Sequence, residues 1–521
     1  MSAALDAAEL AALLGACVPA GLRWLRVAQR EHYLPGSLAR FAARWWTSSP
    51  LNLAGALVAL GAFAASFALP GVAFVSAAVV AAGPHRLAVR GRTSRLVFTR
   101  RLRLVAALGA ALLALVLGAG AAAGGLAGAR IGATAAVLAL PLLLDLALAV
   151  LAPLEERLAR RFVAQASARV GAVGPTIVAI TGSYGKTSTK GYVAHLLAGR
   201  FCVLASPRSF NNRAGLARTV NELLLPGTDV LVAEMGAYGP GEIAEICTWL
   251  SPHVAVITAV GPVHLERFKS LERTLRAKAE ITERAEVSVL NVDDERLARL
   301  ADELGRAGRQ VIRCSASSTD ADVALVGDSE AMVLALGGEV VGRVPADPAA
   351  RPAALGNVAC ALGAAHALGV PAAELLERLS GLPEPPSRLV VSEGASGVRV
   401  LDDTFNSNPA GTRLALERLA RLGGPGARRV VVTPGMVELG ALQDAENAAF
   451  GAAAAEVASE VVVVGRTNRR ALLEGLARAG RRPGAGVVVV ETREEAVAWV
   501  RATLRAGDAV LYENDLPDHF P

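Results

Sequence analysis

The stretch Thr181–Lys190, TGSYGKTSTK, contains residue types that can bind the phosphates of a nucleotide. It follows the β-branched run PTIVAI and precedes GYVAHLLAG, which predicts a strand, a glycine turn and then a helix. Backbone N–H groups of such a turn bind phosphate oxygens, while Lys186 could reach the terminal phosphates and Thr187 could bind Mg²⁺. A full Walker A motif has glycine six residues before the lysine, where this chain has Ile180. A purely structural turn therefore stays an alternative at this point.

The elements that must position this loop follow from the pattern after Arg161. Short β-branched runs (PTIVAI, VLVAEM, VAVITAV, VSVLNV and RQVIRC) alternate with helical stretches, which predicts a parallel sheet covered by helices. A second set of such runs starts at residue 388, after the proline-rich GLPEPPSR of 381–388. We therefore predict a P-loop parallel-sheet ATPase domain over 165–380 and a Rossmann-like α/β C-terminal domain over 388–521.

The region before residue 153 has the composition of a membrane protein. The mean hydropathy of the whole chain is +0.41, and the uncharged runs 51–83, 104–125 and 131–151 (the last broken only by Asp145) hold most of the apolar excess. Since a span needs about 20 apolar residues, we interpret the first run as a hairpin of 51–69 and 72–83, giving about four spans over 51–153. One long span plus a re-entrant piece is the alternative. For Asp145 we expect a helix-packing or interfacial role.

Arginine placement predicts the orientation of these spans. The segment 84–103 holds seven arginines and the segment before residue 51 holds five, whereas the loop 124–130 holds Arg130 alone. By the positive-inside rule the first two segments are cytoplasmic and the loop is outside. We therefore expect a multi-pass protein of the plasma membrane with cytoplasmic catalytic domains. Residues 1–50 would be a cytoplasmic segment whose part 7–31 forms an amphipathic helix on the membrane surface.

Composition excludes some function classes. The net charge of +6 comes from arginine rather than lysine, and much of it flanks the apolar segments. Only 4% of residues are aromatic, so nucleic acid is not an expected partner. Five cysteines are scattered without CxxC or zinc-site spacing, which is typical of reduced structural thiols.

The loop T-G-S-x-G-K-T-S/T, together with motifs that follow it in order, resembles the Mur ligase superfamily. These motifs are FNNRAGL (210–216), EMGAYGPGEI (234–243), VGPVHLERFKSLERTLRAKAEI (260–281), LNVDD (290–294), DDTFNSNP (402–409) and GMVELG (435–440). The chain is most similar to the branch that adds D-alanyl-D-alanine to UDP-muramoyl-tripeptide, the MurF type. The resemblance implies the two soluble domains described above.

The resemblance also implies a reaction and its metal site. In the family, ATP phosphorylates a carboxylate, and an amine then attacks the acyl phosphate to form an amide. Two Mg²⁺ ions assist, so Thr187 and Glu234 are expected ligands and His264 would help to hold the second ion. Lys278 matches the family lysine that reacts with CO₂, and its carbamate would supply an anionic oxygen ligand. A surface lysine is the alternative.

Further roles are carried over from the resemblance alone. Arg388 would act catalytically by approaching the γ-phosphate, in addition to Lys186, Lys278 and His264. Asn211, Asn212 and Glu438 would bind substrate, and turn or capping roles are the alternative for the residues that follow the linker. The residues expected to bind ATP are Gly182, Ser183, Gly185, Lys186, Thr187, Ser188, Asn291, Asn357, Asp403, Phe405 and Asn408.

Several departures from the family pattern concern the substrate. Relatives carry an N-terminal domain that grips the UDP end of the precursor, whereas here the apolar region runs almost directly into the ATPase domain. YENDLPDHFP (512–521) replaces the family K-G-S block, and PGM replaces GDM. In ALGNVACALGAA, Asn357 is kept, but Gly356 and Cys360 replace a histidine and an asparagine. The nucleotide site is therefore better supported than the acceptor.

We predict a membrane-anchored ATP-dependent amide ligase that acts on a carboxylate of a cell-envelope precursor, lipid-linked or soluble. The expected partners are this precursor, an amino acid or dipeptide that supplies the amine, membrane lipid and envelope-synthesis proteins. One alternative is a poly-γ-glutamate-synthase-type ligase in an export complex. Another is a nucleotide-binding scaffold, which would have no reason to keep metal ligands.

Overall fold

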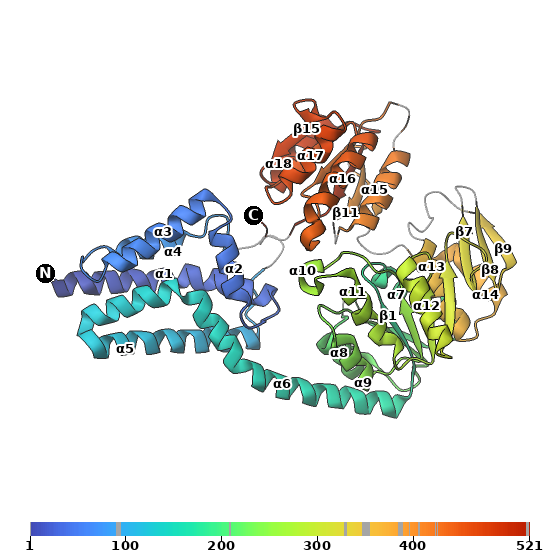
Figure 1. Ribbon diagram of the computed structural model, residues 1–521, viewed down its shortest axis with the longest axis horizontal. Helices are drawn as coiled ribbons and strands as arrows, with labels where there is room; N and C mark the ends of the chain where they lie inside the picture. Colours follow the sequence, from blue (N-terminus) through green and yellow to red (C-terminus); the bar gives the residue numbers. More distant parts are fainter. Residues whose placement is uncertain are drawn as a thin grey trace. The chain divides into compact units, whose positions relative to one another are not determined.

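The computed structural model describes residues 2–89, 95–207, 210–327, 331–345, 355–383, 389–394, 396–404, 407–422, 424, 426–516 and 520. The chain divides into two compact units (Figure 1). The first ends at Leu158 and also takes in the last residues from Leu516, and the second is Ala159–Asp515. Each unit is described by itself.

The N-terminal unit is helical. The helix predicted over 7–31 is present as α1, and Figure 1 shows it between α4 and α5, with Leu13, Trp24 and Ala28 buried in the shared core. An isolated helix on a membrane surface would not take part in such a core. The helices are α1 (Ser2–Arg30), α2 (Ser37–Trp46), α3 (Pro50–Ala65), α4 (Ala73–Ala82), α5 (Arg100–Leu138) and the first part of α6 (Leu140–Val173).

The predicted hairpin over 51–83 is present as α3 and α4. Ser76 Oγ donates to Ala59 O across the pair at 2.9 Å. With 16 and 10 residues, both helices are shorter than the roughly 20 residues that a span needs. By length and composition, the helices over 3–30 and 100–138 can each cross a membrane, and the bent pair 37–46 plus 50–65 could count as a third. This count takes α5 as one helix, so the arrangement of about four spans stays a prediction.

Helix α5 consists of two legs that pack against each other. Gly124 and Gly125 break the helical backbone, and the second has a φ of 61°. A Cβ atom on Gly120 would lie 2.3 Å from Gly128 O, so only glycine allows the two backbones to come this close. Figure 1 shows the chain doubling back at this point, so α5 is not one continuous crossing.

Three charged side chains buried in the N-terminal unit, Asp6, Glu9 and Arg130, form ion pairs. Arg130 Nη1 lies 3.2 Å from Glu9 Oε2, and its Nε lies 3.0 Å from Asp6 Oδ1 as an ion-pair contact without hydrogen-bond geometry. Arg130 Nη2 donates to Ser66 O at 2.8 Å, and Glu9 Oε1 accepts from Ala73 N at 2.7 Å. Since burial of an unpaired charge is costly, this network joins α1, the turn after α3, α4 and α5.

Asp145 has the helix-packing role expected for it. Its carboxylate accepts backbone N–H groups of Gly36 at 2.9 Å, Leu38 at 3.2 Å and Ala39 at 2.8 Å. These are the unsatisfied donors at the N-terminus of α2, where a negative charge is favourable. Asp145 therefore fixes α2 on α6.

The second unit begins with the domain that is predicted to bind ATP (the ATP-binding domain), whose nine-stranded sheet has the order β2-β3-β1-β4-β5-β6-β7-β8-β9. The strands from β2 to β7 in this order are parallel, and β8 and β9 add as an antiparallel hairpin. Their apolar runs are buried on both faces, as in parallel sheets covered by helices. The strands are β1 (Thr176–Thr181), β2 (Val203–Ala205), β3 (Val230–Glu234), β4 (Val254–Ile257), β5 (Val287–Asn291), β6 (Gln310–Ser315), β7 (Val323–Gly327), β8 (Ala331–Leu336) and β9 (Glu339–Pro345).

Helices cover both faces of this sheet (Figure 1). One face packs against α7 (Lys186–Leu197), α13 (Leu355–Ala367) and α14 (Ala372–Arg378). The other packs against the end of α6 and against α8 (Arg213–Leu223), α9 (Glu242–Trp249), α10 (Leu265–Phe268), α11 (Leu271–Ala279) and α12 (Glu295–Arg306). Short 3₁₀ turns follow α11 (η1, Glu280–Thr282) and α14 (η2, Leu379–Gly381).

The C-terminal domain has a seven-stranded sheet in the order β10-β11-β16-β12-β13-β15-β14. All neighbours pair in parallel except β10 and β11, which are antiparallel. The elements are β10 (Val390–Glu393), β11 (Arg399–Asp403), α15 (Pro409–Arg421), β12 (Arg429–Thr433), η3 (Gly440–Leu442), α16 (Gln443–Val457), β13 (Glu460–Val464), α17 (Arg469–Arg478), β14 (Arg482–Pro483), β15 (Gly486–Val490), α18 (Arg493–Thr503) and β16 (Ala509–Glu513). The predicted fold class, helices followed by two α/β domains, is confirmed.

Three cysteines are buried in the ATP-binding domain, on three different elements: Cys247 on α9, Cys314 on β6 and Cys360 on α13. Cys202 is exposed. All of them are free thiols. Burial raises the pKa of Cys247 to about 12, so the protonated form dominates in the folded protein.

Candidate active site

The phosphate loop connects β1 to α7, as the sequence predicts. Gly182 has a φ of 154° and Gly185 a φ of 84°, in the region that favours glycine. Ser183 Oγ fastens the loop to the segment after β4, since it accepts from Gly261 N at 2.9 Å. Lys186 Nζ donates to Gly182 O at 2.7 Å, so the ammonium lies over the loop at the N-terminus of α7. This is the arrangement that binds a nucleotide phosphate.

Glu234, at the end of β3, is the centre of the polar contacts beside this loop. Its side chain is buried, and its Oε2 accepts from Thr187 Oγ1 and from Lys190 Nζ, each at 3.0 Å. Its Oε1 accepts from Asn211 Nδ2 at 3.0 Å. Burial acts to raise the pKa of Glu234, but Lys190, Lys186 and Asn211 together outweigh it, so the pKa is lowered and the carboxylate stays ionised.

Lys190 is a site residue that sequence reasoning missed. It is buried and lies one turn after Lys186 on α7. The signal was present, because residues four apart on a helix share a face and the second lysine of TGSYGKTSTK has this spacing.

The side chains of Thr187 and Glu234 fit a magnesium ion. A hydroxyl and a carboxylate converge at the N-terminus of α7, and Mg²⁺ prefers such hard oxygen donors. No three His, Cys, Asp or Glu side chains gather as a metal site within the described ranges. Among the described residues, the hydrogen-bond donors to the Glu234 carboxylate are Thr187, Lys190 and Asn211 and do not include the other predicted ligands, His264 and Lys278. The metal-binding role of these two residues therefore stays a prediction.

Lys278 is buried on α11, with its Nζ 6.0 Å from the centre of the Phe268 ring. In the part of the chain that the structure describes, its ammonium has no hydrogen bond and no ion pair. Burial, and then the positive charge of Lys186, lower its pKa well below the usual lysine value. A surface lysine, the alternative that the sequence left open, is therefore wrong.

His264 lies after β4 at the start of α10 with a φ of 57°. Its Nδ1 contacts the carboxylate of Glu438, and its ring packs edge-on against Tyr238 with the ring centres 5.0 Å apart. Glu438 O also accepts from Leu265 N at 2.9 Å. The structure thus joins the predicted catalytic histidine to the predicted substrate residue Glu438, a pairing that the sequence did not indicate.

The amides expected to lie near ATP are at the same edge of the sheet. Asn291, at the end of β5, donates to Thr258 O at 3.0 Å, and a Cβ atom on Gly182 would lie 2.0 Å from Thr258 Oγ1. A Cβ atom on Gly185 would lie 2.2 Å from Asn357 Oδ1. Asn291 and Asn357 therefore flank the two glycines of the loop, while Ser188 is buried in the first turn of α7.

Two predicted site residues cap helices. Asn212 Oδ1 accepts from Gly215 N at the start of α8, and Asn408 Oδ1 accepts from Gly411 N at the start of α15, each at 2.9 Å. Such caps are common at helix N-termini, so their substrate and nucleotide roles stay predictions. Asp403 is buried at the end of β11. Arg388 and Phe405 lie outside the described residues.

Two family models match parts of the second unit. A family model described as the Mur ligase middle domain matches residues 180–334, and one described as the Mur ligase glutamate ligase domain matches 387–512. The UDP-N-acetylmuramoyl-tripeptide–D-alanyl-D-alanine ligase of Mycobacterium leprae is 33% identical over 408 residues, which are 70% of this chain and 74% of that protein. The chain belongs to the Mur ligase family.

Other Mur ligases agree with this result. The Mycobacterium bovis ligase of the same name is 34% identical over 404 residues, 70% of this chain and 73% of that one. The MurF ligase of Thermotoga maritima, solved in complex with ADP, has a TM-score of 0.58 and 26% identity, covering 68% of this chain and 80% of that chain. MurF from Acinetobacter baumannii shares the fold, with a TM-score of 0.59 at 23% identity, 68% of this chain and 77% of that chain. The protein is an ATP-dependent Mur ligase of the MurF type, and this family uses Mg²⁺.

Glu513, in the segment that replaces the K-G-S block of other Mur ligases, was not predicted as a site residue. It ends β16 and pairs in register with Asp403 on β11. Its Oε1 accepts from Ser407 Oγ at 2.6 Å, while its buried Oε2 has no hydrogen-bond partner. Burial, and then Asp403, raise the pKa of Glu513 well above the usual glutamate value. The sequence signal for Glu513 was the departure from the family pattern at YEN (512–514).

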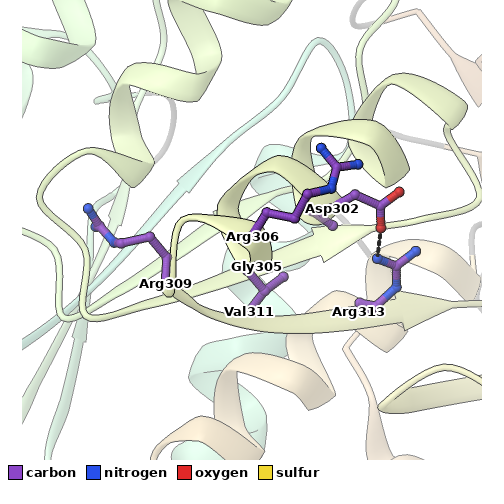
Figure 2. A pocket seen from close by; sticks show the side chains of 7 residues that line it. Asp302, Gly305, Arg306, Arg309, Val311 and Arg313 are labelled. Carbon is purple, nitrogen blue, oxygen red and sulfur yellow. Dashed lines mark hydrogen bonds and ion pairs between the residues drawn. The ribbon is translucent and has the colours of Figure 1, made fainter.

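A hollow of about 390 Å³ between α12 and β6 lies away from the phosphate loop (Figure 2). Three arginines line it, but two of them are occupied by neighbours. Arg313 pairs with Asp302 at 2.7 Å, and Arg309 donates to the carbonyl groups of Thr282 and Ala285 at 2.8 and 2.7 Å. Figure 2 shows Arg309 pointing away from the Asp302–Arg313 pair. This hollow is not part of the candidate active site.

Proposed function

We propose that this Mur ligase joins an amine to a carboxylate of a cell-wall precursor at the membrane, with a lipid-linked precursor as its substrate. The relatives are named for the addition of D-alanyl-D-alanine to UDP-N-acetylmuramoyl-tripeptide, and the same class of reaction is proposed here. The observation that carries the proposal is the convergence of Thr187, Lys190 and Glu234 beside the phosphate loop. A binding protein without a reaction would not need a buried carboxylate there.

The residues of this site would act in two steps. The loop N–H groups and Lys186 hold the terminal phosphates of ATP, and the γ-phosphoryl group passes to the acceptor carboxylate as ADP is released. The amine nitrogen then bonds to the acyl carbon, phosphate leaves, and the nitrogen loses a proton. Thr187 and Glu234 would hold Mg²⁺, which neutralises the charge that develops on the phosphoryl oxygens.

We further propose that Lys278 carries a carbamate. Its burial beside Lys186 favours a neutral amine, which can attack CO₂ to form an N–C bond with loss of one proton. The product is an anion, which would offset the positive charge of the lysines around Glu234. Lys278→Ala should then lose activity, and a small carboxylate in excess should restore part of it. Lys278→Arg should not be rescued, because arginine fills the space and stays charged.

The main test uses the purified full-length protein with lipid-linked and UDP-linked precursors and candidate amines. Lys186→Ala should abolish amine-dependent ADP formation, while the matched variant Arg299→Ala, which removes an exposed cation on α12, should behave as wild type. Wild-type turnover of Lys186→Ala would contradict the assignment of the loop. Turnover of UDP-linked precursors alone would contradict the lipid-linked substrate.

For the helical unit we propose membrane attachment with the ATP-binding domain on the cytoplasmic side. Glu9 on α1 contacts Arg130 and Ala73, so the start of α1 lies with the predicted outer loop. At the other end of α1, Tyr33 lies 3.3 Å from Thr99 Oγ1 and under the guanidinium of Arg101. If α1 spans the membrane, its N-terminus is therefore outside, unlike the cytoplasmic location expected from the sequence.

Cysteine labelling of intact cells tests this topology. A cysteine placed at Ser2 or at Ala127 should react with an impermeant reagent, whereas one placed at Thr99 should be protected. Protection of Ser2 together with labelling at Ala127 would contradict α1 as a span.

A further inference from the structure

A second surface hollow, of about 440 Å³, is lined by Pro240, Arg273 and Arg276. The two arginines are three residues apart and therefore neighbours on the exposed face of α11. Within the described residues, neither guanidinium has a hydrogen bond or a close ion pair. The hollow is thus lined by two guanidinium groups that form no ion pair with a carboxylate of the described residues.

The carboxylates around this hollow have other partners. Glu242 Oε2 accepts from Tyr238 N at 3.0 Å. Glu280 accepts from Gly241 N at 2.7 Å and from Ala244 N at 3.0 Å, which closes the start of α9 onto the end of α11. Glu272, whose charge is near Arg276, is fully exposed, and hydrogen bonds to its own backbone and to Ser270 lower its pKa. These hydrogen bonds hold the segment that carries Pro240 in place. Among the described residues, no buried carboxylate neutralises the charges of Arg273 and Arg276.

The first hollow provides a comparison. Its Arg309 and Arg313 are held by carbonyl groups and by Asp302, so they carry structural roles (Figure 2). Arg273 and Arg276 have no such role, and the difference points to a ligand that comes from outside. Guanidinium groups bind phosphate oxygens in a bidentate way, more strongly than neutral donors do.

The second hollow shares two walls with the candidate active site. Tyr238, two residues before Pro240, packs against His264. Lys278, two residues after Arg276, is buried on the other side of α11. A ligand in the hollow would therefore lie next to the loop that begins at Glu234 and next to the helix that carries Lys278.

We infer that Arg273 and Arg276 bind the phosphate or diphosphate group of the acceptor precursor, and this inference rests on the proposed ligase function. It makes the two arginines determinants of acceptor binding outside the nucleotide site. The phosphate could belong to a lipid-linked or to a nucleotide-linked precursor, since both offer the same chemistry to the guanidinium groups.

The test compares the double variant Arg273→Gln/Arg276→Gln with Arg299→Gln/Arg306→Gln, which removes two exposed arginines from α12. With the full-length protein, the first variant should raise the KM for the acceptor about tenfold, with kcat and the KM for ATP unchanged. The α12 variant should match wild type. A defect with the lipid-linked precursor, the UDP-linked precursor or both supports the inference and identifies the source. An unchanged KM for both acceptors overturns it.

A binding measurement separates this inference from the proposed function. Inorganic pyrophosphate is titrated into the protein saturated with ADP, which fills the phosphate loop, and heat is recorded. Pyrophosphate binding that is lost in Arg273→Gln/Arg276→Gln but kept in Arg299→Gln/Arg306→Gln supports a phosphate site in the hollow, even where no ligation is found. If both variants bind pyrophosphate equally and the protein still ligates, the inference about Arg273 and Arg276 is wrong, and the proposed ligase function is unaffected.

Discussion

Arg130 in the N-terminal unit is buried between two carboxylates, whereas Glu234 in the ATP-binding domain is buried beside lysines. Around Arg130, the ion pairs and the backbone partners of Glu9 satisfy the charges, and all partners come from the helices themselves. Around Glu234, Lys190 is in direct contact, and Lys186 adds further positive charge. The first arrangement is complete, but the second has an excess of positive charge that suits a polyphosphate anion. Paired buried charges thus indicate structure, and unbalanced ones indicate a site.

The largest effect is expected from Glu234→Gln, which removes the single negative charge among these lysines. The amide would bind Mg²⁺ poorly, so kcat should fall about a thousandfold while the fold is kept. Amine-dependent ADP formation measures this. Glu222→Gln, an exposed carboxylate on α8, is the control and should keep wild-type turnover. An active Glu234→Gln protein would show that the charge imbalance has no catalytic meaning.

The next effect concerns stability. Arg130→Ala leaves Glu9 and Asp6 buried without their cation, and should destabilise the helical unit by about 3 kcal/mol. Thermal unfolding of the full-length protein in detergent measures the loss. The triple variant Arg130→Met/Glu9→Gln/Asp6→Asn, which removes all three charges, should recover most of it. If Arg130→Ala unfolds at the wild-type temperature, the network is not what holds α1 in place.

The smallest effect is expected from Glu513→Gln. Because burial and Asp403 raise the pKa of Glu513 in the folded protein, the folded state keeps a proton that the unfolded chain releases at the usual glutamate pKa. The contribution of Glu513 to the free energy of unfolding has its full value at pH below the usual glutamate pKa. It falls as the pH rises from that value toward the raised pKa of the folded state. The glutamine variant does not titrate, so it should be more stable by about 1 kcal/mol at neutral pH and should lose this pH dependence.

Denaturant unfolding at several pH values checks this result. Glu474→Gln, an exposed glutamate on α17, is the matched control and should follow the wild-type profile. A Glu513→Gln protein with the wild-type pH dependence would show that Glu513 does not titrate in the expected range.

The sequence predicted the phosphate loop, the two α/β domains and Glu234, because these depend on local patterns of strand, turn and helix. It missed β7 to β9 as a continuation of the sheet, since antiparallel addition depends on pairing partners that no local pattern defines. The His264–Glu438 contact was also missed, because the two residues are 174 positions apart. In the helical unit, the apolar pattern predicted the helix α1 but not its packing. The helices that it packs against, α4 and α5, are distant in the sequence, and no local pattern defines them.

The buried thiols of Cys247, Cys314 and Cys360 can be used as probes of local unfolding in the ATP-binding domain. An alkylating reagent must reach the sulfur atom, so a buried thiol reacts only when the element that carries it opens. The three residues lie on a helix of one face, a central strand and a helix of the opposite face. Equal labelling rates would mean that the sheet opens as a single cooperative unit, whereas faster labelling of Cys247 would reveal that α9 detaches first. Exposed Cys202 gives the reagent's intrinsic rate in the same molecule.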